Sequence, residues 1–281
     1  MKVTFYGVRG SIAVPGPSTV RYGGNTVCVG VRTADGSLLQ LDAGTGARVL
    51  GDELLASGVP DPVHLFITHG HWDHIMGAPF FGPIWRPETR IIIHAMSERN
   101  ARLRDRMVLF DGEHFPVRTN ELPARLEQPP AVTRVRAGSA VVTTIALNHP
   151  GGSDGFRVDD DDGSSLCYLT DNELGAADAV TATDALARFA HGVGLLIHDA
   201  QYTREELREK RGWGHSAVED VLELGRAAEA RVLALHHHDP WRDDAALDQA
   251  AARAAEWTQA HAPAMRTLVA SEGLVLDVVA S

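Results

Sequence analysis

The sequence has few cysteines, few aromatic side chains and no long apolar run. Its 281 residues include only two cysteines, Cys28 and Cys167, each within an apolar stretch typical of a buried strand. These two residues exclude a dense disulfide framework, and we expect both thiols to be reduced. No apolar run approaches the length of a membrane-spanning helix, so the sequence predicts no association with a membrane.

Positive charge is also scarce. Lys and Arg number 26 against 37 Asp and Glu, which gives a formal net charge of -11. A protein that holds a long nucleic acid neutralises its phosphates with Lys and Arg, so this balance argues against such a partner. The N-terminal segment MKVTFYGVRGS lacks the apolar core of an export signal, and we therefore expect a cytoplasmic protein.

The order of apolar patterns predicts an α/β fold. Strands are expected at 3–7, 26–32, 37–42, 63–68, 91–94, 132–136, 140–147, 155–159, 164–171, 194–199 and 231–238, with two more near 266–279. Helices are expected at 48–57, 97–110, 182–191, 216–229 and 243–261. Residues 111–131 have the composition of irregular surface structure or a lid. Sheets covered by helices follow from this order, and no linker divides residues 1–281, which predicts one domain.

The densest group of polar side chains is THGHWDH, where His69, His71, Asp73 and His74 follow the apolar run 63–68. In extended chain His69 and His71 point the same way, and Asp73 and His74 begin the next helix. Imidazole and carboxylate together suit zinc, manganese or iron. Strand and helix capping could explain one of these residues, but four potential ligands within six positions predict two metal ions.

Further candidate ligands stand where other apolar strands end. His149 follows 140–147, Asp171 ends 164–171, and one of His236, His237 and His238 ends 231–238. The ends of strands are where α/β folds place their sites. We therefore expect these side chains to complete the shells of both metal ions.

This series of motifs resembles the metallo-β-lactamase superfamily. The similarity covers nearly the whole chain, from the N-terminal strands to LALHHHDP, and LDAGTG (41–46) is similar to the first motif of the superfamily. The resemblance implies a four-layer αββα sandwich. It also implies that Asp42 braces the loops of the metal site rather than binding a metal ion.

The resemblance implies a ligand set for two divalent ions. The ligands implied for the first ion are His69, His71 and His149. Those implied for the second ion are Asp73, His74 and a late histidine, with Asp171 bridging both ions. Among the three late histidines we favour His237, because it lies three residues before Pro240, the offset seen in the ribonuclease Z branch. Zinc is the preferred ion, with manganese and iron as alternatives.

A second motif, GWGHS, resembles the branch of the superfamily that contains ribonuclease Z and the cyclic phosphodiesterases. In that branch the histidine, here His215, assists cleavage of the phosphodiester, and Asp199 in LIHDAQY would orient it. Two cations supply a bridging hydroxide near neutral pH, which Asp73 and Asp171 would fix in place. The lack of an export signal argues against a true β-lactamase. The predicted strands near 266–279 argue against a glyoxalase II, which has a helical substrate domain at its C-terminus.

The expected substrate is a small phosphodiester: a cyclic nucleotide, a cyclic sugar phosphate or a short dinucleotide. Ribonuclease Z itself commonly carries a long basic arm for transfer RNA between the residues that match His149 and Asp171, where this chain has 21 residues and an acidic turn. Alternatives are a hydrolase of an acyl ester, thioester or lactone, and a non-catalytic metal-binding sensor.

The segment APFFGPIW (78–85) is a candidate for a pocket wall or homodimer interface, although internal packing explains it more simply.

Overall fold

Two seven-stranded sheets face each other in the computed structural model, which describes residues 1–98, 110–113 and 115–280. The strands of the first sheet, in spatial order, are β14 (Val275–Asp277), β1 (Lys2–Gly7), β2 (Cys28–Arg32), β3 (Leu38–Leu41), β4 (Val63–Phe66), β5 (Arg90–His94) and β6 (Arg125–Glu127). Those of the second are β13 (Arg266–Val269), β12 (Val232–His236), β11 (Leu195–Asp199), β10 (Ser165–Leu169), β9 (Ser153–Asp160), β8 (Ala140–Leu147) and β7 (Arg134–Ala137).

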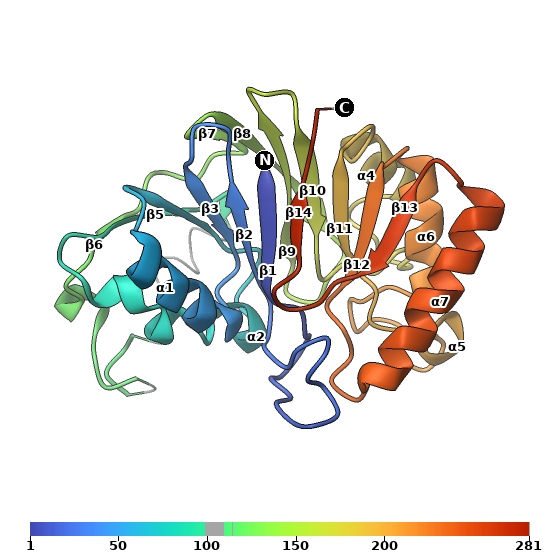
Figure 1. The fold of residues 1–281 in the computed structure, drawn as a ribbon, viewed down its shortest axis with the longest axis horizontal. Helices are drawn as coiled ribbons and strands as arrows, with labels where there is room; N and C mark the ends of the chain where they lie inside the picture. The colour runs from blue at the N-terminus through green and yellow to red at the C-terminus, as the bar shows by residue number, and fades with distance from the viewer. Residues whose placement is uncertain (99–109, 114, 281) are drawn as a thin grey trace.

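Helices cover the outer faces of both sheets (Figure 1). The first sheet is covered by α1 (Gly46–Ser57), and the second by α4 (Thr183–Phe189), α6 (Val218–Ala227) and α7 (Asp244–His261). Of the two short helices, α2 (Trp72–Ile75) lies below β1 near the centre of the view and α5 (Arg204–Leu207) lies at the lower right, beside α7. The 3₁₀ turns are η1 (Ala78–Phe80), η2 (Gly82–Trp85) and η3 (Thr119–Glu121). The four-layer αββα sandwich is therefore confirmed.

Successive side chains of a strand point to opposite faces of its sheet and so fill the two cores on either side of it. In β10, Leu166 and Tyr168 point into the cluster between the two sheets, whereas Cys167 and Leu169 point into the cluster under α4, α6 and α7. Both faces of this strand are covered, which is why SLCYL reads as a continuous apolar run rather than an alternating one. Both cysteines are buried and unpaired, as expected.

Parallel strands bring the predicted site residues to one edge. In the first sheet β3, β4 and β5 run parallel, and in the second β10, β11, β12 and β13 do. Because the carboxyl ends of parallel strands meet at the same edge, the loops that follow β3, β4, β10, β11 and β12 converge. Figure 1 shows α2, which follows β4, at that edge and between the two halves of the molecule.

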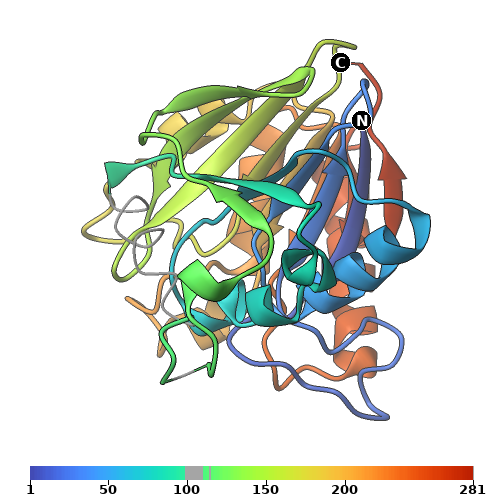
Figure 2. The ribbon, with the colours of Figure 1, turned by 90° about the vertical axis from the view of Figure 1, so that its left-hand side faces the viewer.

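The differences from the sequence prediction are local. The helix expected at 97–110 falls almost entirely outside the described residues. Segment 111–131, expected to be irregular, contains η3 and the edge strand β6, and Figure 2 shows it along the side of the molecule beside β5. A three-residue strand is too short to show alternation, so its sequence carries no signal. In the described part of the chain, no helix has both the length and the apolar character that crossing a bilayer requires.

The APFFGPIW segment packs inside the first half of the molecule. Phe81 and Ile84 are buried in the cluster between α1 and the first sheet, and Phe80 is exposed but contacts the ring of Phe115. Packing therefore accounts for most of this segment.

Candidate metal centre

The first group of predicted ligands comes together at this edge. His69, His71, His149 and Asp171 each place one ligand atom within 4.8 Å of the others. His149 Nε2 lies 3.0 Å from His71 Nδ1. The same nitrogen and His69 Nε2 each lie 3.7 Å from Asp171 Oδ2. Three imidazole nitrogens therefore face one carboxylate oxygen.

The second group contains Asp73, His74 and His237 and shares Asp171 with the first. His237 Nε2 lies 3.2 Å from Asp73 Oδ2 and 3.1 Å from Asp171 Oδ1, and His74 Nε2 lies 3.2 Å from Asp171 Oδ1. The two oxygens of Asp171 thus face different groups, Oδ2 the first and Oδ1 the second. This is the arrangement expected of a carboxylate between two cations.

The donor atoms fit divalent cations. The Nε2 atoms of His69 and His74 are buried and have no hydrogen-bond partner among the described residues, which is costly unless a cation accepts their electron pairs. Burial keeps the pKa of His69 well below its usual value, so the ring stays neutral and one of its two nitrogens carries a free electron pair. Burial also opposes a charge on His74, yet Asp171, Asp73 and Asp42 outweigh it and raise its pKa well above the usual value. Positive charge is therefore favoured where the second ion would lie.

Asp42 braces the two loops that carry the histidines. Its carboxylate is fully buried and accepts hydrogen bonds from Thr68 N (2.8 Å), Thr68 Oγ1 (3.0 Å) and Tyr168 Oη (3.0 Å). It also lies 2.8 Å from His74 Nδ1. A carboxylate at Nδ1 fixes the tautomer of His74 and leaves Nε2 as the electron-pair donor. Asp42 therefore contacts the candidate ligand His74 and lies outside the two groups of potential ligands.

Two glycines let these loops touch. Ala43 N donates to His74 O (2.7 Å), and Gly77 N donates to Ala43 O (2.9 Å). A Cβ atom on Gly77 would lie 1.8 Å from Gly44 O, and one on Gly44 would lie 2.2 Å from Asp73 O. Gly44 in the first motif and Gly77 after the histidine motif are therefore needed for the close approach of the backbones.

Replacing Asp42 with asparagine is expected to weaken metal binding about 10- to 100-fold, because His74 loses the carboxylate that fixes its ring. Asp42 has a φ of 60°, a left-handed conformation that asparagine tolerates, so the backbone should be kept. Competition with a chromogenic chelator would measure the affinity. Asp52→Asn, on the exposed face of α1, is the matched control; equal affinity in both variants would contradict the bracing role.

His215 and Asp199 lie beside the second group. His215 Nδ1 is 2.7 Å from Asp199 Oδ2, and its ring stacks on that of His237 with centroids 5.0 Å apart. Burial alone would lower the pKa of His215, but the Asp199 carboxylate outweighs it and raises the pKa to about 9. The structure thus brings the predicted pair into contact and favours a protonated His215 at neutral pH.

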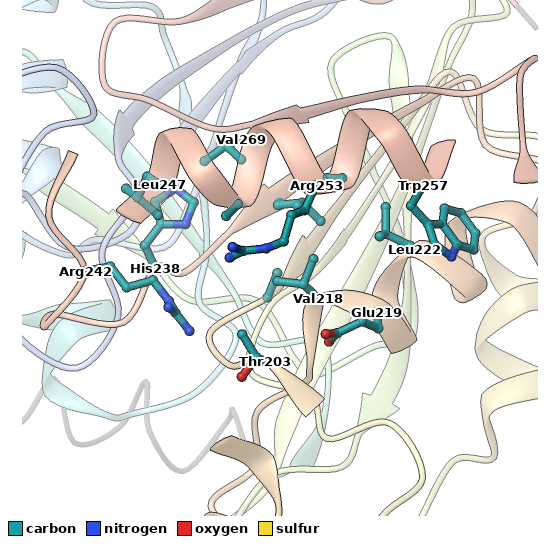
Figure 3. A pocket seen from close by; sticks show the side chains of 14 residues that line it. Thr203, Val218, Glu219, Leu222, His238, Arg242, Leu247, Arg253, Trp257 and Val269 are labelled. Carbon is teal, nitrogen blue, oxygen red and sulfur yellow. The ribbon is translucent and has the colours of Figure 1, made fainter. Parts of the chain in front are cut away.

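Of the three late histidines, His237 alone lies in the cluster. His236 is buried between the sheets, where its ring contacts Phe5 and its Nε2 lies 3.2 Å from Gly7 O. His238 Nε2 donates to Ala270 O (2.8 Å), and its ring lines a separate cavity of about 190 Å³ beneath α7. Figure 3 shows this cavity, with Val218 and Leu222 of α6 on the opposite wall.

Several contacts were not predicted. Gln201 Oε1 lies 3.0 Å from His237 Nδ1, and Gly214 O accepts from His149 Nδ1 at 2.9 Å. Ser11 N donates to Asp73 Oδ2 at 2.7 Å. Gln201 lies two residues after Asp199, in the motif already singled out, so its position was the available signal. The other two contacts come from the backbone, which no side-chain pattern reveals.

A model of the "Beta-lactamase superfamily domain" matches residues 39–238, a range that includes every predicted ligand. The chain belongs to the beta-lactamase superfamily. Ribonuclease Z of Haloarcula marismortui is 25% identical over 291 residues, covering 84% of this chain and 86% of that protein. Human tRNase Z, short form, shares the fold with a TM-score of 0.63 at 20% identity and 99% coverage of both chains. A diphosphatase of the PhnP family superimposes with a TM-score of 0.66 at 18% identity, covering 100% of this chain and 99% of that one.

These findings confirm a metal-dependent hydrolase of the phosphodiesterase branch. They also show that excluding a long nucleic acid was wrong, because the matched curated relatives are ribonucleases. The error came from net charge, which averages over the whole surface, whereas a substrate meets only the field around the site. Ribonuclease Z, expected to fit less well, is the activity named for those relatives.

Proposed function

We propose that this chain hydrolyses phosphodiester bonds in RNA with two divalent ions, preferably zinc. The observation that carries the proposal is Asp171, whose two oxygens face separate groups of histidines. Its support for RNA is the set of ribonuclease Z relatives, which the chain matches over most of its length. The assigned ligands are His69, His71, His149, Asp171, Asp73, His74 and His237.

When bound, two divalent ions would lower the pKa of water and offset charge on the phosphoryl oxygens. The chain's own residues orient the reactants. Asp171 faces both groups and Asp73 lies in the second, and a carboxylate oxygen of either can accept a proton from the attacking water. The Nδ1 proton of His215 is held by Asp199, so its Nε2 proton is the one that a leaving alkoxide receives.

A small cyclic phosphodiester is the second candidate substrate. The 21 residues between His149 and Asp171 are mostly taken up by β9 and β10, which pair as a hairpin. A long arm for transfer RNA therefore does not occupy this position. An enzyme that shares the site without the arm is suited to a smaller phosphodiester as well as to RNA.

The test is a panel of substrates with zinc, manganese or iron restored to metal-stripped protein. We expect cleavage of a structured RNA with a single-stranded 3′ extension, and a smaller rate with cyclic AMP and bis(p-nitrophenyl) phosphate. His69→Ala should abolish these rates, whereas His261→Ala, at the exposed end of α7, should not. Turnover of a lactone or thioester without any phosphodiester cleavage would overturn the proposal.

A further inference from the structure

Three exposed tryptophans lie in the segments that carry residues of the candidate metal centre. Trp72 is 68% exposed, Trp213 is 59% exposed and Trp241 is 92% exposed, whereas Trp85 and Trp257 are partly buried. Each of the three lies within four residues of a predicted site residue: His71 and Asp73, His215, and His237. Exposed large apolar side chains that follow or precede site residues, rather than being scattered over the chain, indicate a binding role.

The first two tryptophans are connected through the ring of His149. Trp72 follows His71, whose Nδ1 lies 3.0 Å from His149 Nε2. Trp213 precedes Gly214, whose carbonyl oxygen accepts from the other nitrogen of the same ring at 2.9 Å. These backbones thus flank the first metal group from opposite sides of one imidazole.

The third tryptophan is connected to the second through Lys210. Trp213 N donates to Lys210 O at 3.1 Å, and Lys210 Nζ lies 3.5 Å from Asp239 Oδ2. Asp239 Oδ1 accepts from Trp241 N at 2.8 Å. The ammonium group of Lys210 also lies 4.1 Å from the centroid of the Tyr202 ring, so this lysine is linked to both of the loops that carry Trp213 and Trp241.

We propose that Trp72, Trp213 and Trp241, here called the aromatic rim, stack on the bases of single-stranded RNA while Lys210 attracts its backbone. Exposed aromatic side chains interleaved with cations are how proteins hold single strands, because every base presents a face for stacking. The proposal rests on the proposed function, since the phosphodiester to be cleaved would lie at the metal centre inside the rim. A membrane or an apolar protein partner would not account for the phosphodiesterase site within the rim.

The test is the affinity of the metal-loaded protein for a fluorescein-labelled, single-stranded RNA dodecamer, measured by anisotropy with phosphorothioate linkages that resist hydrolysis, so that binding is read without cleavage. Each of Trp72→Ala, Trp213→Ala and Trp241→Ala is expected to weaken binding about 5- to 100-fold. The corresponding Trp→Phe variants should keep most of the affinity, because a phenyl ring still stacks. Val279→Ala, 65% exposed near the C-terminus, is the control expected to bind like the parent.

An abasic dodecamer of the same length separates stacking from charge. The parent should bind it more weakly than the normal RNA, and the three alanine variants should bind it as the parent does. Unchanged affinity of all three variants for normal RNA would overturn the rim proposal even if the parent cleaves RNA. The rim proposal would also be overturned if the three substitutions weakened binding to phosphatidylglycerol vesicles but not binding to RNA. Base-dependent binding by a parent that cleaves no phosphodiester would support the rim and overturn the proposed function.

Discussion

Asp171→Asn is expected to lower the rate of phosphodiester hydrolysis by on the order of 1,000-fold, because the variant loses the charge that holds both cations. Each oxygen of Asp171 faces a different histidine group, so one substitution affects both sites. Asp171 has a φ of 58°, and asparagine accepts that conformation, so the turn after β10 should be preserved. Metal content after dialysis should fall below that of the parent.

The control for this experiment is Asp52→Asn, which removes an exposed carboxylate paired with Arg48. It should keep the parent's metal content and rate, because exposed ion pairs contribute little. Urea unfolding of both variants would show that the loss is not caused by an unfolded chain. An Asp171→Asn protein that keeps its metal ions and its rate would contradict the bridging role.

His215→Ala is expected to lower kcat for RNA about 100- to 10,000-fold, the usual contribution of a general acid, while metal content stays unchanged. His215 is held by Asp199 and is not one of the seven assigned ligands. The loss should be much smaller with bis(p-nitrophenyl) phosphate, because p-nitrophenolate leaves readily without a proton. This difference between substrates is the sharpest sign of proton donation.

Asp199→Asn serves as the companion to that variant. It keeps the His215 ring but removes the carboxylate that raises its pKa, so a smaller loss with the same dependence on leaving group is expected. If His215→Ala slows both substrates equally, His215 instead positions the phosphoryl group. If it slows neither, the histidine has no part in the reaction.

Most of the candidate ligands could be predicted from the sequence because they stand where apolar strands end. Asp171 and His237 follow the parallel strands β10 and β12, whose carboxyl ends meet at one edge. His149 follows β8, which is antiparallel to β9 and therefore runs in the same direction as β10, so it reaches the same edge. Alternation also separates His236 from the site: it continues the inward face of Ala234 in β12 and so points between the sheets. His237 then turns with a φ of 57°, which no pattern of side chains could reveal.

The substrate was harder to predict because it depends on local surface, not on composition. A net charge of -11 does not show which charges lie in the loops that carry the site residues, where Lys210 pairs with Asp239. The segment with Lys210 and Trp213 and the segment with Asp239 and Trp241 are far apart in sequence and come together only through the loops after α5 and β12. The same holds for Gln201 and Ser11, whose contacts with His237 and Asp73 depend on folded loops.

The central claim is that two divalent ions at the shared carboxylate carry out phosphodiester hydrolysis. Its most direct test is titration of metal-stripped protein with zinc while bound metal and the hydrolysis rate are followed together. We expect the rate to rise with bound zinc and to reach its plateau only when the second equivalent is bound. A full rate after one equivalent, or no hydrolysis after saturation with zinc, manganese or iron, would contradict the account.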